Sequence, residues 1–335
     1  MRIPQKTNFN YGYLQTVRTQ PMSVFVPRKL FAHNCRPQKR AGGFTFFLQL
    51  TKSDLCGRIL AGINFVRPDN TFLKGLFLMK EFFGFGGYQR IPEGYFSWQH
   101  LTFVSSLMLI MVCAALFFGL KNKNKTEKQK NRVLIAAAII IDSAEIFKLI
   151  ISCVRAQDPL AWLNDLPLFL CSIQLITIPL AAFSKGRIKN AALDFVFIFG
   201  LLGAVMGTYF AGQNYGCYPV LSFDNVISGF THSISGFTSL YIAISRMASM
   251  KKRNIWITFT ILLGFCGAAL IANKLLDYNY MFLRAGDGTP YDIVYNLVNG
   301  NAILYPLCVI GLFLVYIVAF YFVFYLCTKK SAHKK

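Results

Sequence analysis

Acidic residues and histidines are scarce in this sequence, and the motifs of common metal sites are missing. Its 335 residues include 14 Asp and Glu against 35 Lys and Arg, and only four histidines. It contains no H-E-x-x-H or C-x-x-C motif, and its nine cysteines show no metal-ligand spacing. We therefore expect neither a catalytic metal nor a cofactor. Most of the cysteines lie in apolar runs, where a free thiol behaves as a small hydrophobic side chain, so no disulfide framework is predicted.

The surplus of positive charge does not indicate a nucleic-acid-binding protein. The lysines and arginines gather mainly at the ends of apolar runs, as they do in membrane proteins, and no basic and aromatic binding fold is visible. Hydrophobic residues make up 55% of the chain, and several apolar runs approach the roughly 20 residues that a transmembrane helix needs. The sequence therefore predicts an all-α, multi-pass membrane protein.

Seven segments are predicted to cross the membrane as a helix bundle. They are residues 98–120, 133–155, 160–183, 191–211, 222–247, 255–276 and 303–327. Lys and Arg are frequent in 121–132, 184–190, 247–254 and the C-terminal tail, whereas 212–221 has none and 275–302 has only Arg284. By the positive-inside rule, this alternation predicts an outside N-terminus and an inside C-terminus.

Residues 1–78 are unlike the remainder, which we expect to form the membrane domain (79–335). They hold twelve Lys and Arg against two Asp and Glu and show no sustained helical period. One interpretation is a basic, mostly disordered arm that lies on anionic lipid. The interpretation that we favour is that the protein starts at Met79.

The third predicted span has an unusual set of polar residues. Residues 163–180 are apolar enough to cross a bilayer, yet they include Asn164, Asp165, Cys171 and Gln174. A helix here would bring Asn164, Cys171 and Gln174 to one face, with a kink caused by Pro167. Polar groups in hydrocarbon are costly unless they face a bundle interior or a cavity. This face is therefore predicted to belong to a functional site.

Cys171, His232 and Glu145 are predicted to lie at the same depth, about 15 Å below the outer surface at 1.5 Å per helical residue. A thiol in apolar surroundings is inert, but a neighbouring imidazole can take its proton and make it a nucleophile. Glu145 could orient that imidazole as the third member of a triad, or form an ion pair with Lys148. The residues alone leave open Cys–His catalysis, structural burial of His232 in a helix–helix seam, and a transport pathway.

A resemblance to a known family favours catalysis. Phe96-Ser-Trp-Gln-His100, Glu145, Leu166-Pro-Leu-Phe-Leu-Cys-Ser-Ile173, Phe230-Thr-His232 and Asn279-Tyr-Met-Phe-Leu283 resemble segments of the bacterial YwaF-type membrane proteins, which are related to eukaryotic transmembrane protein 164. The resemblance covers about 79–327. It implies a location in the bacterial cell membrane and transfer of a fatty acyl chain between glycerophospholipids, with a lysophospholipid or an ether phospholipid as acceptor. It also implies a thioester on Cys171, with His232 as the base.

Further polar residues are candidates for supporting roles. Gln174, one turn from Cys171, is the candidate donor to a tetrahedral oxyanion. Contacts with the lipid substrate are predicted for His100, Asn164, Asn273, Asn279 and Tyr280, although His100 could equally anchor its helix at the interface. The predicted partners are membrane phospholipids as acyl donor and acceptor, without nucleic acid or metal.

The sequence also departs from the family pattern and allows a rival function. Phe169 stands where many relatives have a histidine, and residues 284–290 differ from the shorter run expected before Pro290, so the substrate and the outer lid are expected to differ. The rival is a non-catalytic transporter or channel, in which Asp142, Glu145 and Asn273 would line a polar path.

Overall fold

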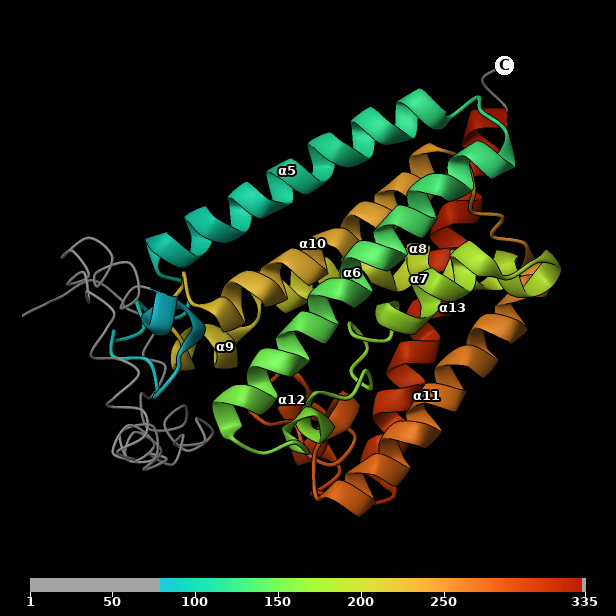
Figure 1. Cartoon of the computed structure of the whole chain (residues 1–335). Helices are drawn as coiled ribbons and strands as arrows, with labels where there is room; N and C mark the ends of the chain where they lie inside the picture. Colours follow the sequence, from blue (N-terminus) through green and yellow to red (C-terminus); the bar gives the residue numbers. More distant parts are fainter. Residues whose placement is uncertain (1–78, 333–335) are drawn as a thin grey trace, which may run out of the picture.

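The computed structural model describes residues 79–332, with side chains up to residue 326. The predictions for residues 1–78 lie outside these described residues. All regular structure within them is helical (Figure 1). The long helices are α5 (Trp98–Asn122), α6 (Glu127–Ala156), α8 (Gly186–Tyr209), α10 (Phe223–Ile244), α11 (Ile255–Leu276) and α13 (Leu304–Ala332). The shorter ones are η2 (Ala161–Asp165), α7 (Gln174–Phe183), α9 (Gly212–Cys217), η3 (Lys252–Asn254), η4 (Tyr280–Phe282) and α12 (Tyr291–Leu297).

Four helical segments in the described range are long and apolar enough to cross a membrane. They are Trp98–Asn122, Gly186–Cys217, Lys252–Leu276 and Leu304–Leu326. The helices α6 and α10 are also long, with 30 and 22 residues, but they contain more polar side chains. The count of seven spans and the orientation of the termini stay predictions.

The prediction of one continuous helix for the third span is wrong. Residues 160–183 do not form one helix: η2 is followed by an irregular stretch, 166–173, and then by the ten-residue helix α7. Pro167 helps to explain the break, because a residue before proline avoids helical angles and Leu166 is extended, with φ −57° and ψ 145°. The predicted helical face with Asn164, Cys171 and Gln174 therefore does not exist.

Helix α8 is the centre of the bundle. In its membrane-length segment 61% of the residues are buried, against 22–28% for the other three segments of that kind. It packs on α10, α7 and α11, while α5 packs mainly on α10 at the edge (Figure 1). Each of the three hydrophobic clusters in the described residues includes side chains of α8. Groups that must be held deep in the protein can therefore be supported from α8.

A buried carboxylate fastens α8 to the connection between α10 and α11. Asp194 is fully buried and accepts hydrogen bonds from the backbone N–H of Ser249 (3.1 Å) and of Met250 (2.9 Å). It also accepts from Asn254 Nδ2 at 3.0 Å and from the Tyr321 hydroxyl at 3.2 Å. A buried charge is tolerated when hydrogen bonds replace its hydration, as these four do.

A second polar clamp joins α6, α10 and the segment before α5. Arg155 donates from both terminal nitrogens to the Asp224 carboxylate, at 2.6 and 2.8 Å, and the Tyr88 hydroxyl donates to the same carboxylate at 2.6 Å. Burial, together with the charge of Asp224, raises the pKa of Tyr88. Near this clamp Cys217 is disulfide-bonded, although the sequence predicted no disulfide framework.

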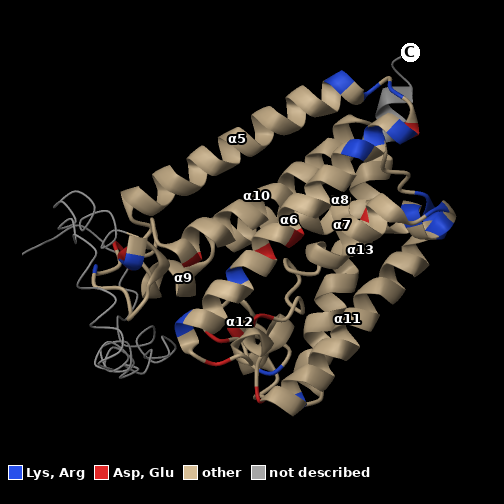
Figure 2. Ribbon diagram, in the orientation of Figure 1, with Lys and Arg blue, Asp and Glu red and all other residues tan. Residues whose placement is uncertain are grey.

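Most, but not all, of the described basic residues gather at one end of the bundle. Figure 2 shows them near the α5–α6, α7–α8 and α10–α11 connections, which lie close together. The same connections are the basic ones in the sequence. The predicted topology requires these connections to lie at the same end of the bundle, because cytoplasmic loops carry the positive charge.

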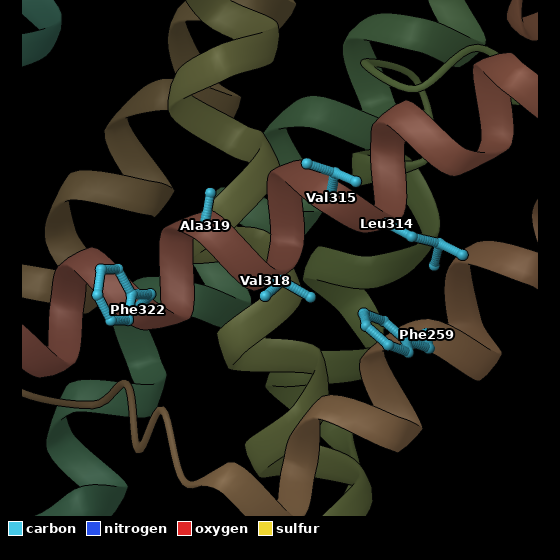
Figure 3. A pocket seen from close by; sticks show the side chains of 6 residues that line it. All are labelled: Phe259, Leu314, Val315, Val318, Ala319 and Phe322. Atoms are coloured by element: carbon cyan, nitrogen blue, oxygen red, sulfur yellow. The ribbon is translucent and has the colours of Figure 1, made fainter.

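A shallow apolar groove of about 410 Å³ lies between α11 and α13 (Figure 3). Its lining is Phe259, Leu314, Val315, Val318, Ala319 and Phe322. Such a surface suits contact with lipid chains. The groove contains none of the predicted site residues.

The network at Asp194 yields a test of what holds the bundle together. We expect Asp194→Ala to lower the free energy of unfolding by about 3 kcal/mol, because buried donors lose a charged acceptor. The measurement is thermal unfolding of the purified protein in detergent. Asp277→Asn is the control, since Asp277 is exposed, forms its ion pair with the exposed Arg284, and has a positive φ that asparagine tolerates; equal effects of the two changes would refute this account.

Candidate functional site

Cys171 lies in a tight turn directly before α7. The Ser172 hydroxyl donates to the Phe169 carbonyl at 3.1 Å and accepts from the Phe169 N–H at 3.0 Å. The N–H of Ile173 also donates to Phe169 O, at 2.9 Å. These three bonds satisfy both backbone groups of Phe169 without a continuous helix, so they stabilise the turn that carries Cys171.

Two glycines of α8 make room for Cys171 and His232. A Cβ atom on Gly203 would lie 3.3 Å from Cβ of Cys171, and one on Gly207 would lie 2.0 Å from Nε2 of His232. Positions four residues apart share one helix face, about 6 Å from each other. Cys171 and His232 therefore lie against adjacent turns of α8, on the same side.

The hydrogen bonds of His232 determine its tautomer. Nδ1 lies 2.7 Å from the Ser228 carbonyl oxygen and 3.4 Å from the Ser228 hydroxyl. A carbonyl oxygen can only accept, so Nδ1 carries a proton, and in the neutral imidazole Nε2 presents the lone pair. Nε2 is fully buried and has no hydrogen bond of normal geometry within the described residues. The neutral imidazole of His232 can therefore act as a base, with Nε2 as the accepting atom.

The Cys171 thiol is the group that faces this imidazole. The two side chains are close enough to interact electrostatically. Cys171 and His232 are each partly exposed as residues, although Nε2 itself is enclosed. His232 can accept the proton of the Cys171 thiol and stabilise the negative charge left on the sulfur. These are the requirements for a cysteine nucleophile.

Glu145 forms an ion pair and is not the group that bonds Nδ1 of His232. Its carboxylate binds Lys148 at 2.8 Å, and Lys148 also binds Asp165 at 3.2 Å. The ion pair with Lys148 that the spacing allowed is thus formed, and it connects α6 to η2. The backbone carbonyl of Ser228 orients His232 instead.

The predicted substrate-contact residues are engaged in bonds within the protein. His100 Nε2 donates to the Thr208 carbonyl at 3.1 Å, and its Nδ1 accepts from the Phe96 N–H at 3.1 Å. Both ring nitrogens are therefore occupied and the residue is buried. His100 thus connects the start of α5 to α8, and its two predicted roles stay predictions.

The outer residues 273–285 are organised in the same way. The Asn273 side chain bonds the backbone N–H and carbonyl of Tyr280, and the Tyr280 hydroxyl donates to the Leu163 carbonyl. Asn279 bonds Arg284 N at 2.8 Å and the Ala285 carbonyl at 2.8 Å. The rings of Tyr280 and Phe282 pack against the ring of Phe169, two residues before Cys171. Asn164 bonds only the nearby Ala161 carbonyl, at 3.3 Å.

Gln174 keeps an unused donor. It is fully buried at the start of α7, where its Oε1 accepts from the Thr177 hydroxyl at 3.1 Å. Its Nε2 has no hydrogen-bond partner among the described residues. An unpaired buried donor is costly, which makes it a candidate for contact with a bound group.

Several residues of the site were not identified from the sequence. Gly203 and Gly207 carry no chemical signal, and Ser172 and Ser228 are ordinary small residues in apolar runs. Tyr291, at the start of α12, stacks on Phe282 with ring centres 5.7 Å apart. Burial, and to a smaller extent the nearby Cys171, raises the pKa of Tyr291. Helical periodicity could not have brought these residues to Cys171, because the Cys171 segment is not a helix.

No group of three or more His, Cys, Asp and Glu side chains that could hold a metal occurs within the described residues. The helices and the enclosed thiol–imidazole pair together define a helical membrane protein with a Cys–His site. A sequence model of the TMEM164 family matches residues 95–329. The chain belongs to the TMEM164 family. No curated protein and no solved structure matches it.

The contact at Gly207 yields a prediction about thiol reactivity. We expect Gly207→Ala to displace the imidazole and to slow alkylation of Cys171 by iodoacetamide at least about tenfold, because the thiol loses its proton acceptor. Peptide-level mass spectrometry measures Cys171 separately from the other cysteines. The matched control is Gly264→Ala in α11, where an added Cβ meets nothing within 4 Å. Unchanged alkylation in Gly207→Ala would contradict the pairing of Cys171 with His232.

Proposed function

We propose that this protein is a membrane-embedded phospholipid acyltransferase that moves an acyl chain between glycerophospholipids through a thioester on Cys171. The observation that carries this proposal is the contact of Cys171 and His232 with adjacent turns of α8, with the lone pair of Nε2 enclosed. A general base and a nucleophile within reach of each other are the minimum for covalent acyl transfer. The resemblance to an acyltransferase family favours the same chemistry.

The first half of the reaction forms the thioester. Nε2 of His232 takes the proton of the Cys171 thiol, and the sulfur attacks the carbonyl carbon of a phospholipid ester. The carbonyl π electrons move to oxygen and give a tetrahedral oxyanion. When this oxyanion collapses, the ester C–O bond breaks and the departing lysophospholipid oxygen takes the proton from Nε2.

The second half passes the acyl chain on. Nε2 takes the proton of the hydroxyl of an acceptor lysophospholipid, whose oxygen attacks the thioester carbonyl. Collapse of the second oxyanion breaks the C–S bond, and Cys171 leaves as the thiolate and recovers the proton. Cys171 and His232 return to their starting states, and no oxidant, reductant or metal is consumed.

The surroundings of the pair favour transfer over hydrolysis. Two residues before Cys171, the ring of Phe169 packs against the rings of Tyr280 and Phe282. A lipid can enter such an apolar site from the bilayer, whereas water enters with difficulty. The thioester would therefore survive until an acceptor lipid arrives.

Covalent capture tests the proposal. Purified protein incubated with a phospholipid that carries an alkyne-tagged acyl chain is expected to become labelled at Cys171, and hydroxylamine should release the label. Cys171→Ala should abolish labelling, and His232→Gln should reduce it at least about 100-fold because the base is lost. Cys308→Ala, a change at another partly exposed free cysteine, should label normally. Absence of a hydroxylamine-sensitive label on the wild-type protein would refute the proposal.

The role of Glu145 distinguishes the enzyme from a transporter. In an enzyme, we expect Glu145→Gln to leave labelling of Cys171 within about threefold, because Glu145 binds Lys148 and not His232. A transporter with a path around Glu145 would instead lose its activity in this variant and tolerate Cys171→Ala. Parallel labelling assays and liposome flux assays on both variants make the distinction.

A further inference from the structure

The basic end of the bundle carries exposed positive charge that the protein does not neutralise. The stretches 121–132, 184–190 and 246–254 contain Glu127 as their only acidic residue, and Glu127 pairs with Lys130 at 3.5 Å. The other lysines and arginines of these stretches form no ion pair within the part of the chain that the structure describes. Together they make a basic surface, which attracts a partner of opposite charge. Its members are Lys121, Lys123, Lys125, Lys128, Arg132, Lys185, Arg187, Lys189, Arg246, Lys251, Lys252 and Arg253.

Large apolar side chains lie exposed beside these cations. Phe183 and Ile188 are 63% and 55% exposed, and they flank Lys185 and Arg187 in the α7–α8 connection. Trp256, at the start of α11, is 71% exposed. A soluble anion would neutralise the charges but leave these side chains in water. A lipid leaflet offers phosphate groups to the cations and hydrocarbon to the apolar side chains, so it matches both.

Hydrogen bonds to α6 hold the α7–α8 connection at both of its ends. The Asn131 side chain donates to the Ala182 carbonyl at 2.7 Å and accepts from Lys189 Nζ at 2.6 Å. Lys185 and Arg187 lie between these two attachment points and are exposed. The backbone that carries them is therefore already ordered, which lowers the entropic cost of binding a ligand there.

We propose that the α7–α8 connection binds anionic phospholipids of the leaflet at the basic end of the bundle. Lys185 and Arg187 bind the lipid phosphate, for which a guanidinium group is especially suited. Phe183 and Ile188 lie among the acyl chains. The other cations of the basic surface raise the concentration of anionic lipid around this site. The proposal uses neither Cys171 nor His232, so it stands apart from the acyl transfer proposed above.

Lipid binding to the full-length protein tests the proposal. Protein purified in a neutral detergent is mixed with phosphatidylglycerol and phosphatidylcholine of identical acyl chains, and native mass spectrometry measures how much of each stays bound. We expect phosphatidylglycerol to bind at least about tenfold more tightly, because both lipids carry a phosphate but only phosphatidylglycerol has a net negative charge. Equal binding of the two lipids would overturn the proposal.

Lys185→Gln combined with Arg187→Gln removes the two cations of the site. Each charge near a lipid surface contributes about fivefold, so the affinity for phosphatidylglycerol should fall about 25-fold and the preference over phosphatidylcholine should disappear. The matched control is Lys274→Gln with Arg284→Gln, which removes two exposed charges at and beyond the far end of α11. All four side chains are exposed, so neither variant should change the unfolding temperature. Equal losses of lipid affinity in the two variants would refute the site.

Glycerol phosphate distinguishes a lipid from a soluble anion as the partner. At the concentration of phosphatidylglycerol it should displace less than about a tenth of the bound lipid, because it makes no contact with Phe183 and Ile188. Phe183→Ser with Ile188→Ser should weaken the binding of both lipids at least about tenfold. Full displacement by glycerol phosphate, or unchanged lipid binding in the serine variant, would identify a soluble anion as the partner and overturn the proposal.

Discussion

The candidate site depends on glycine, which has no side chain, at position 207 of α8. Nε2 of His232 occupies nearly the same space that a Cβ atom at position 207 would fill. One turn away, Gly203 lets the backbone of Cys171 approach α8 closely. Because α8 has no side chains at Gly203 and Gly207, Cys171 of the loop and His232 of α10 can approach the same face of this helix. The interior is close-packed, so even one methyl group there would separate them.

The charged residues of the protein serve mainly to connect its parts. Asp194 joins α8 to the α10–α11 connection, Asp224 joins α6 and α10, and Lys148 joins α6 to η2. Each of these buried or partly buried charges has its partners. The site, by contrast, keeps two buried nitrogens, Gln174 Nε2 and His232 Nε2, without normal hydrogen bonds. At the Cys171 thiol, a bound substrate would supply the hydrogen-bond partners that these polar atoms lack within the protein.

The site also differs from a Ser-His-Asp arrangement in the group that orients the histidine. A backbone carbonyl, of Ser228, holds Nδ1 where a carboxylate would stand in a triad. A carbonyl one helical turn away fixes the tautomer through the helix itself, so no charged residue has to be brought to this depth. This is consistent with the engagement of Glu145 by Lys148.

The sequence by itself determined the helical membrane class, the long helices other than the third predicted span, and the two chemically distinctive residues, Cys171 and His232. Hydrophobic length and charge patterning are local properties, and reactive side chains are few enough to be recognised. The sequence also separated the family from others through short motifs around these residues. It could not determine that 166–173 is irregular, because the choice between helix and turn depends on the bonds that Ser172 forms with Phe169.

Only the tertiary structure decided which neighbours complete the site. Helical periodicity placed Cys171 on a face with Asn164, whereas the turn directs it toward Gly203 and toward His232. Glu145, the nearest carboxylate by depth, is bonded to Lys148, and the oxygen that orients the imidazole belongs to the backbone. Glycines, backbone amides and carbonyls have no distinctive side chain, so their roles become visible only when the folded chain brings them within a few ångströms of the sulfur and the imidazole.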